Sequence, residues 1–228
     1  MRLLITILSI LLLANTAIAE NNIVLKTKKE KISYGIGMDI GKNLKTQNID
    51  INPEILAQGI KDAFSGVKPL LTEEEFVNTM TIFKKEMMAK QREQMKALGE
   101  KNKKEGETFL EDNKKKEGVV ILPSGLQYKV VKEGKGEIPK LTDTVNVHYR
   151  GTLIDGAEFD SSYNRGQPAT FEVNGVIAGW KEAIQLMKTG SKWQLFVPSN
   201  LAYGEIGTRG KIGPNATLIF DVELLSIK

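Results

Sequence analysis

The chain has 228 residues, and its 32 basic and 28 acidic residues give a net charge of only +4 at neutral pH. It contains no cysteine and a single histidine, which excludes thiol catalysis, disulfide bonds and cysteine-ligated metals and leaves no expected metal site. Neither half of the chain carries a strongly one-signed charge, so we expect no binding of nucleic acid.

Residues 1–19 have the pattern of a signal peptide. Arg2 gives a positive start, an apolar run follows from Leu3 to Leu13, and Ala17-Ile18-Ala19 supplies a small-x-small cleavage site. The apolar run is shorter than the roughly 20 residues that a membrane-spanning helix needs. We therefore predict export of a mature chain that starts at Glu20, most simply to a bacterial periplasm. Association with the outer membrane and display on the cell surface stay open as alternatives.

Residues 20–72 are predicted to form an all-helical module. Its first helix has apolar residues at a regular spacing of four, namely Ile32, Ile36, Ile40 and Leu44. Its second helix begins after Asn52, where Pro53 suits the first helical turn, and ends at Gly66.

The stretch from Gly35 to Gly41 is rich in glycine and is similar to a dinucleotide-binding fingerprint. Its glycine spacing differs by one residue, no strand precedes it and no β-α-β unit surrounds it. We therefore expect no nucleotide site here. Close approach of two helices, which the missing side chains permit, is the preferred interpretation.

A long helix is predicted over residues 73–117. Thr72 and Glu75 form a capping box, in which each side chain accepts a hydrogen bond from a free backbone N–H group. Most residues in the second half of this helix are charged, with the signs mixed, which indicates a solvated stalk. Gly99 and Gly106 are expected to weaken the helix by about 1 kcal/mol each.

From residue 118 onward, short alternating segments predict an α+β domain with a mostly antiparallel sheet. The predicted strands are Leu126–Lys132, Thr144–Gly151, Ser191–Val197 and Thr217–Ile227. A single clear helix is predicted from Trp180 to Met187.

The only histidine, His148, lies on one of these strands and near two serines, which raises the question of a hydrolytic site. Alternation along the strand places His148 on the face opposite to the inward-facing Tyr149. Ser161 and Ser162 have no second histidine to activate them, and no G-x-S-x-G motif is present. We therefore expect His148 to be a partly exposed strand residue without a catalytic role.

Several motifs in this domain occur together and in a characteristic order. They are Tyr149-Arg150-Gly151, Asp155-Gly156, Phe159-Asp160-Ser161-Ser162, Val176-Ile177-Ala178-Gly179-Trp180, Ala202-Tyr203-Gly204 and the segment Ala216–Leu224. Through them, the region from about Gly125 to Lys228 closely resembles the FKBP-type peptidyl-prolyl cis-trans isomerases. The resemblance implies an FKBP-like antiparallel sheet wrapped around a short helix.

Residues 28–122 resemble the helical module of the secreted macrophage infectivity potentiator (Mip) and FkpA-like subgroup, through DIGKNLKTQNIDINPEILAQGIKDAFSG followed by KPLLTEEEF. This resemblance implies a homodimer that forms through the N-terminal helices. The expected organisation is a signal peptide at 1–19, a dimerisation module at 20–72, a long linker helix at 73–117 and an isomerase domain at 118–228.

The resemblance also implies a proline-binding site. Tyr149, Asp160 and Tyr203 are expected at the catalytic positions. The expected substrate-binding residues are Phe159, Arg165, Val176, Ile177, Trp180, Ile212 and Phe220. Ala169 and Lys211 depart from the family pattern, which predicts a more open rim. Phe171 and Trp193 are interpreted as core residues.

The predicted activity is therefore isomerisation of X–Pro bonds, which assists the folding of exported proteins. Rotation about this bond has a barrier of about 18–20 kcal/mol but breaks no covalent bond, so no nucleophile or cofactor is expected. The expected partners are proline-containing unfolded or exported polypeptides. The resemblance further implies inhibition by macrolides similar to tacrolimus and rapamycin.

The alternative function is a dimeric holdase chaperone, in which the helices bind unfolded clients and isomerase turnover is secondary. An apolar stripe at 4-3-4 spacing on the long helix fits either a dimer core or a client-binding surface: Phe76, Met80, Phe83 and Met87. The dimer core is the preferred interpretation.

Overall fold

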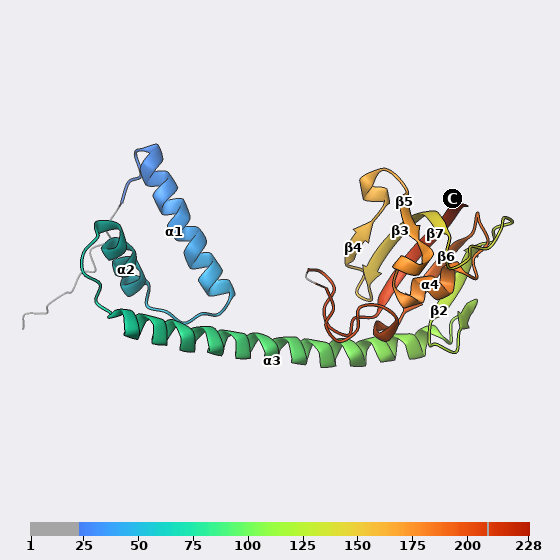
Figure 1. Ribbon diagram of the computed structural model, residues 1–228, viewed down its shortest axis with the longest axis horizontal. Coiled ribbons are helices and arrows are strands. Elements are labelled where there is room, and N and C mark those ends of the chain that lie inside the picture. The colour runs from blue at the N-terminus through green and yellow to red at the C-terminus, as the bar shows by residue number, and fades with distance from the viewer. Residues whose placement is uncertain (1–22, 209) are drawn as a thin grey trace, which may run out of the picture. The chain divides into compact units, whose positions relative to one another are not determined.

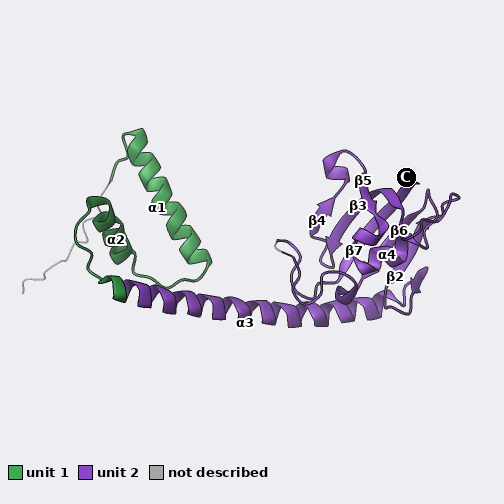
Figure 2. Cartoon of the chain, in the orientation of Figure 1, with its two compact units in different colours: residues 1–75 green, residues 76–228 purple. Residues whose placement is uncertain are grey.

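The computed structural model describes residues 23–208 and 210–228, and the contacts group the chain into two compact units, Met1–Glu75 and Phe76–Lys228 (Figure 2). The predicted signal peptide and its cleavage site lie outside the described residues. Within the described ranges, no helix combines the length and the apolar character needed to cross a membrane. The two units are described separately below.

The first unit contains the two predicted short helices, α1 (Lys28–Thr46) and α2 (Pro53–Ser65). Thr27 and Glu30 cap α1 with reciprocal hydrogen bonds, and the Asn52 side chain caps α2 just ahead of the proline. Gly66 ends α2 with φ of 65°, a left-handed conformation that glycine adopts without strain. Neither helix contains a buried residue.

The long helix α3 (Glu73–Asn113) begins with the predicted capping box. The Thr72 N–H donates to Glu75 Oε2 at 2.8 Å, and the Glu75 N–H donates to Thr72 Oγ1 at 3.2 Å. The prediction of a solvated helix is wrong for one face of the second half, where Gly99, Gly106 and Asn113 are buried. These residues are buried because this face of α3 contacts the β-sheet domain and its loops. The pattern of charges along the helix does not reveal this contact.

The second unit is built on a seven-stranded antiparallel sheet with the strand order β1-β2-β6-β7-β3-β4, in which β5 also pairs with β3 (Figure 1). The strands are β1 (Val119–Ile121), β2 (Gln127–Lys132), β3 (Thr144–Leu153), β4 (Glu158–Ser161), β5 (Ala169–Glu172), β6 (Lys192–Val197) and β7 (Leu218–Ile227). The four predicted strands are confirmed as β2, β3, β6 and β7. Strands β1, β4 and β5 are too short to show a clear alternation in the sequence.

Besides α3 from Phe76 onward, the second unit contains one helix and three short 3-10 turns. The helix α4 (Ala178–Ile184) begins and ends earlier than the predicted Trp180–Met187 and lies against one face of the sheet (Figure 1). The turns are η1 (Tyr163–Arg165), η2 (Val173–Gly175) and η3 (Ser199–Leu201). The turn η1 lies between β4 and β5, η2 lies between β5 and α4, and η3 lies between β6 and β7.

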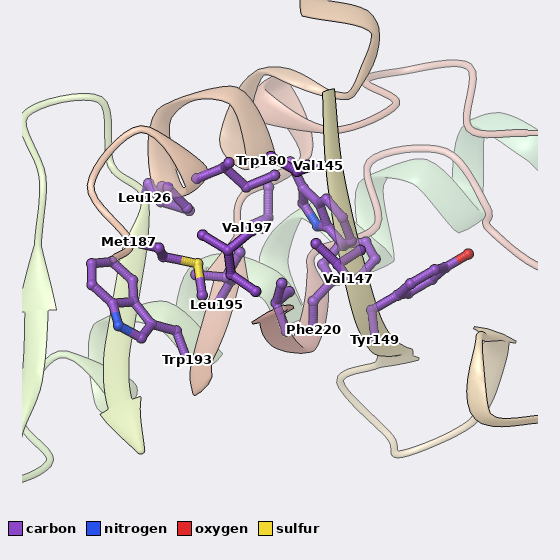
Figure 3. Close-up of a cluster of buried hydrophobic side chains, with 14 of the residues drawn as sticks. Leu126, Val145, Val147, Tyr149, Trp180, Met187, Trp193, Leu195, Val197 and Phe220 are labelled. Carbon is purple, nitrogen blue, oxygen red and sulfur yellow. The ribbon is translucent and has the colours of Figure 1, made fainter. Parts of the chain in front are cut away.

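The core of this unit lies between α4 and the inner face of β3, β6 and β7, and Figure 3 shows its side chains meeting there. Val145 and Val147 from β3 and Leu195 and Val197 from β6 are fully buried. Trp193 is also buried, and its ring stacks on Tyr128 at 4.2 Å between centroids, so its predicted packing role is confirmed.

Candidate functional site

A cavity of about 310 Å³ opens beside this core. Its lining consists of Tyr149, Phe159, Asp160, Phe171, Gly175, Val176, Ile177, Trp180, Tyr203 and Phe220. Eight of the ten residues predicted for the site are among them; Arg165 and Ile212 are not. Strands β3, β4, β5 and β7, helix α4 and two loops contribute the lining.

The floor and walls of the cavity are aromatic rings that meet edge to face. The Trp180 ring has its centroid 5.3 Å from that of Tyr149 at an interplanar angle of 89°, and 5.3 Å from that of Phe220 at 80°. Phe159 meets Phe220 at 5.5 Å and 85°. Such pairs add about 0.5–1.5 kcal/mol each beyond the burial of their surface. The rings therefore form a rigid apolar surface.

Gly151 on β3 makes this ring arrangement possible. It is buried and pairs in register with Phe220 of β7 and Asp160 of β4. A Cβ atom at this position would lie 2.5 Å from Cζ of Phe159 and 3.0 Å from Cε1 of Phe220. Any side chain at position 151 would therefore push Phe159 out of the wall.

Tyr149 and Asp160 form a polar edge of the cavity, and Arg165 binds both of them. The Tyr149 hydroxyl donates to Asp160 Oδ2, and Arg165 donates from Nη1 to Asp160 Oδ1 at 2.5 Å. A second Arg165 donor, Nη2, reaches the Tyr149 hydroxyl at 2.8 Å. The Arg165 guanidinium carbon lies 5.5 Å from the centroid of the Tyr149 ring. Arg165 therefore holds Tyr149 and Asp160 in position, although it does not line the cavity itself.

These contacts set the charge of the polar edge. Burial on its own would raise the pKa of Asp160, but the hydrogen bonds from Tyr149 and Arg165 and the guanidinium charge outweigh it and lower the pKa. Burial, and then the hydrogen bond to Asp160, raise the pKa of Tyr149. At neutral pH the site therefore holds an ionised carboxylate paired with arginine, beside a protonated phenol.

The loop that leads into α4 supplies a free hydrogen-bond donor. The Ile177 carbonyl accepts from Trp180 N at 3.0 Å and from Lys181 N at 3.0 Å, which fixes the residue at the start of the helix. Within residues 23–208 and 210–228, the Ile177 N–H has no hydrogen-bond partner. It borders the cavity and is available to a ligand carbonyl.

The loop between η3 and β7 places Tyr203 at the cavity. Tyr203 is 42% exposed, and its hydroxyl makes no hydrogen bond to any part of the chain that the structure describes. Ile212, from the other arm of this loop, is only 6% exposed and belongs to the core cluster instead of the lining. Of the two site residues predicted in this loop, Tyr203 therefore lines the cavity and Ile212 does not.

A hydrogen bond links the loop at Lys211 to the neighbouring strand β4. Lys211 Nζ donates to the Glu158 carbonyl oxygen at 3.1 Å, which ties the loop to β4. The more open rim predicted from Ala169 and Lys211 stays a prediction.

The prediction that Phe171 is a core residue is incomplete, because Phe171 packs against the core cluster and also lines the cavity. Its ring lines the cavity, with its centroid 5.8 Å from that of Trp180 and 5.9 Å from that of Tyr149. The prediction assumed that Phe171 alternates with Val173 on one strand, but β5 ends at Glu172 and Val173 begins the turn η2. The break in the strand lets Val173 enter the core while Phe171 joins the wall.

His148 is a partly exposed strand residue, as predicted. Its Nδ1 lies 3.0 Å from Ser162 Oγ, and its ring stacks on Tyr163 at 4.7 Å between centroids. The buried Ser162 hydroxyl also accepts from the Tyr149 N–H at 2.8 Å. These contacts tie β3 to the segment after β4, and none of these side chains other than Tyr149 lines the cavity.

Comparison with known proteins matches two sequence families. Residues 135–225 match a family described as FKBP-type peptidyl-prolyl cis-trans isomerase. Residues 29–130 match a family described as the domain amino terminal to FKBP-type peptidyl-prolyl isomerase. The two matches follow the order of the helical and sheet segments along the chain.

Similar proteins extend over most of the sequence. The outer membrane protein MIP of Legionella longbeachae is 52% identical over 204 residues, which are 90% of this chain and 88% of that protein. The peptidyl-prolyl cis-trans isomerase Mip of Coxiella burnetii is 46% identical over 228 residues, which cover 100% and 98% of the two chains. The crystal structure of FkpA from Escherichia coli is 39% identical and matches with a TM-score of 0.71, covering 90% of this chain and 99% of that one.

Proposed function

The chain belongs to the FKBP-type peptidyl-prolyl cis-trans isomerases, and on that premise we propose that the cavity binds a proline ring and accelerates rotation about the preceding peptide bond. The observation that carries this proposal is the concave wall of edge-to-face rings around Trp180. A pyrrolidine ring is small, apolar and rigid, and such a wall holds it without a reactive side chain.

Catalysis follows from the polarity of the cavity. A planar amide is more polar than a twisted one, and water stabilises the planar form through hydrogen bonds to its carbonyl. An apolar cavity removes that water, so it binds the twisted amide in preference to the planar one. Each ~1.4 kcal/mol of this preference accelerates the reaction tenfold. Neither a nucleophile nor a cofactor takes part in these steps.

The polar groups have positioning and polarising roles in this proposal. The free Ile177 N–H donates to a carbonyl of the bound peptide and fixes its register. The carboxylate of Asp160 faces the rotating amide and keeps Tyr149 and Arg165 in the wall. The unpaired Tyr203 hydroxyl lies at the cavity, where it contacts the substrate backbone. Macrolides similar to tacrolimus or rapamycin compete for the same apolar surface.

Exchange NMR on a peptide with a single X–Pro bond tests this proposal. We expect Asp160→Ala and Tyr203→Ala to lower the catalysed exchange rate, because each removes a polar contact at the cavity. His148→Ala serves as the matched control and should leave the rate near that of the unmodified protein, because His148 does not line the cavity. Loss of activity in the histidine variant would overturn the assignment of the site.

The N-terminal helices form, in our proposal, the interface of a homodimer. Neither α1 nor α2 buries a residue, and their large apolar side chains are exposed, among them Ile36 (57%), Ile55 (68%) and Phe64 (91%). An apolar groove of about 400 Å³ runs between the two helices. Most of the stability of a helix in a protein comes from packing of its apolar face, so a second copy of the same helices is the proposed cover.

The glycines of α1 support this interface. A Cβ atom at Gly35, Gly37 or Gly41 would meet nothing within 4 Å in the described chain, so these glycines are not explained by contacts within one copy. Close approach of a helix from the second copy would use the space they leave. The expectation of close helix packing therefore becomes a proposal about the dimer.

Sedimentation velocity tests the dimer. The chain from Glu20 should sediment as a dimer, and a fragment covering residues 119–228, which lacks α1, α2 and the α3 stripe, should sediment as a monomer. This fragment is a suitable comparison because every buried hydrophobic residue of the described chain lies within it. Dimerisation of the fragment would contradict the proposed interface.

A client-binding role is the second candidate function, because the apolar stripe on α3 is exposed or half-buried in the single chain and fits a client surface as well as a dimer core. Phe76 is 51% exposed and Met80 is 45% exposed in the single chain. We propose the periplasm as the place where both activities assist exported polypeptides, because of the signal-peptide pattern at residues 1–19. Suppression of aggregation by the chain from Glu20, but not by residues 119–228, would locate client binding in the helical part of the chain that carries the stripe.

A further inference from the structure

One face of α3 docks on the catalytic unit. The residues of this face, called here the docking row, follow at alternating spacings of three and four: Gly99, Asn102, Gly106, Phe109 and Asn113. They are buried or half-buried, whereas the charged residues between them are exposed. A helix presents such a row along one side, so the row is a continuous contact strip.

The first part of the docking row holds the base of the loop between η3 and β7. Asn102 Nδ2 donates to the Pro214 carbonyl oxygen at 2.8 Å. In the opposite direction, Asn215 Nδ2 donates to the Gly99 carbonyl oxygen at 3.3 Å. A Cβ atom at Gly99 would lie 3.3 Å from Pro214 Cβ, so the helix and the loop are in direct contact.

The second part of the row anchors the helix to the sheet. A Cβ atom at Gly106 would lie 2.3 Å from Thr217 Oγ1, which shows how closely the backbone of α3 approaches the start of β7. Gln127 of β2 donates to the Leu110 carbonyl oxygen at 3.0 Å and accepts from Asn113 Nδ2 at 3.0 Å. The docking row therefore joins α3 firmly to the catalytic unit over about four turns.

The base of the loop connects to the cavity through backbone hydrogen bonds. The Asn215 N–H donates to the carbonyl oxygen of Gly204 at 2.8 Å, and Gly204 directly follows the cavity residue Tyr203. Asn215 itself has φ of 55°, a left-handed conformation that asparagine tolerates better than most residues. Asn215 thus contacts α3 with its side chain and the Tyr203 arm with its backbone.

We propose that α3 supports the substrate site from outside the cavity. Asn102 is a positioning residue that holds Tyr203 at the cavity through Pro214 and Asn215. This inference rests on the isomerase function proposed above and adds a residue outside the cavity to it. Without the Asn102 contact, the carbonyl of the buried Pro214 loses its side-chain donor, and the Tyr203 arm gains freedom to leave the cavity.

The test uses the full exported chain with Asn102→Ala and the isosteric Asn102→Asp, which keeps the shape but cannot donate. Lys103→Ala is the matched control, because Lys103 is the exposed neighbour on the same helix turn. Exchange NMR measures peptide affinity and exchange rate at saturation. We expect both Asn102 variants to bind the peptide roughly fivefold more weakly, as for the loss of one hydrogen bond, with the rate at saturation changed less than twofold.

A double-variant measurement separates positioning from general destabilisation. If Asn102 acts through Tyr203, Asn102→Ala should have no further effect on affinity in a Tyr203→Ala background. Equal weakening in both backgrounds would overturn the proposal, as would affinities for both Asn102 variants that match the Lys103→Ala control.

Hydrogen exchange of the loop amides gives a readout that does not depend on catalysis. Asn102→Ala should speed the exchange of the Asn215 amide, which is hydrogen-bonded to Gly204, while Lys103→Ala should not. Unchanged exchange at Asn215 would overturn the anchoring role even if the enzyme is active. Absence of isomerase activity in the unmodified chain would instead overturn the proposed function, so the two failures are distinguishable.

Discussion

Replacement of Gly106 by alanine distinguishes a docked α3 from a solvated one. In a solvated helix, the change would raise the free energy of unfolding by about 1 kcal/mol, because alanine is the better helix former. In the structure, the new Cβ would lie 2.3 Å from Oγ1 and 3.1 Å from Cβ of the buried Thr217. Overpacking of this kind costs about 1–3 kcal/mol. The gain of about 1 kcal/mol in helix propensity subtracts from this cost, so we expect a net loss of up to about 2 kcal/mol, most of it from the 2.3 Å approach to Oγ1.

Urea unfolding followed by tryptophan fluorescence measures this change. The chain has two tryptophans, Trp180 and Trp193, and both lie in the core of the second unit, so the signal reports on the unit that α3 contacts. Thr217→Ala removes the atom nearest to the new methyl group. In the double variant with Gly106→Ala, we therefore expect most of the lost stability to return, which a double-mutant cycle quantifies.

The sign of the change in unfolding free energy shows whether α3 is docked or free in solution. An increase of about 1 kcal/mol in the Gly106→Ala variant would mean that the helix is free in solution and that the docking row does not form. A loss that Thr217→Ala does not relieve would mean that the strain arises elsewhere than at this contact.

Two further predictions concern the cavity. Gly151→Ala should lower the catalysed exchange rate at least about tenfold while the protein stays folded, because the added methyl group displaces Phe159; a rate near that of the unmodified protein in exchange NMR would contradict the wall geometry. Asp160 has a lowered pKa in the folded protein, so its ionised form stabilises the fold fully above the ordinary aspartate value of about 3.9, and this stabilisation is lost as the pH falls through the lower folded value. Urea unfolding from about pH 8 to pH 3 should therefore show a decline in acid that is smaller in Asp160→Asn, with no Asp160-dependent change between about pH 5 and pH 8.

Most of the fold could be predicted from the sequence because its signals are local. The capping box at Thr72, the proline at position 53 and the alternation along β3, β6 and β7 each act within a few residues. The ring residues of the cavity were found through their motifs, since the same aromatic positions serve both the core and the site. Phe171 was predicted as a core residue only, because the sequence does not show that the strand ends one residue after it, at Glu172.

The docking of α3 could not be predicted from composition, because its signal is a set of small and polar residues. Gly99 and Gly106 are helix-weakening residues when the helix is considered alone, yet their missing side chains permit contact with Pro214 and Thr217. The spacing of Asn102 and Asn113 with these glycines was a usable clue. However, Gly99, Asn102 and Gly106 contact residues that lie more than 100 positions later in the chain. No local sequence pattern specifies such distant partners.

The rings of Trp180, Tyr149 and Phe220 belong both to the core and to the floor of the cavity. Natural selection for a different substrate therefore has little freedom at the floor, because a change that reshapes it also weakens folding. Heritable variation that survives should accumulate instead on the loop around Tyr203, whose residues reach solvent. Divergence among descendants of this protein would then be concentrated in a short stretch of surface, over a floor that stays nearly constant.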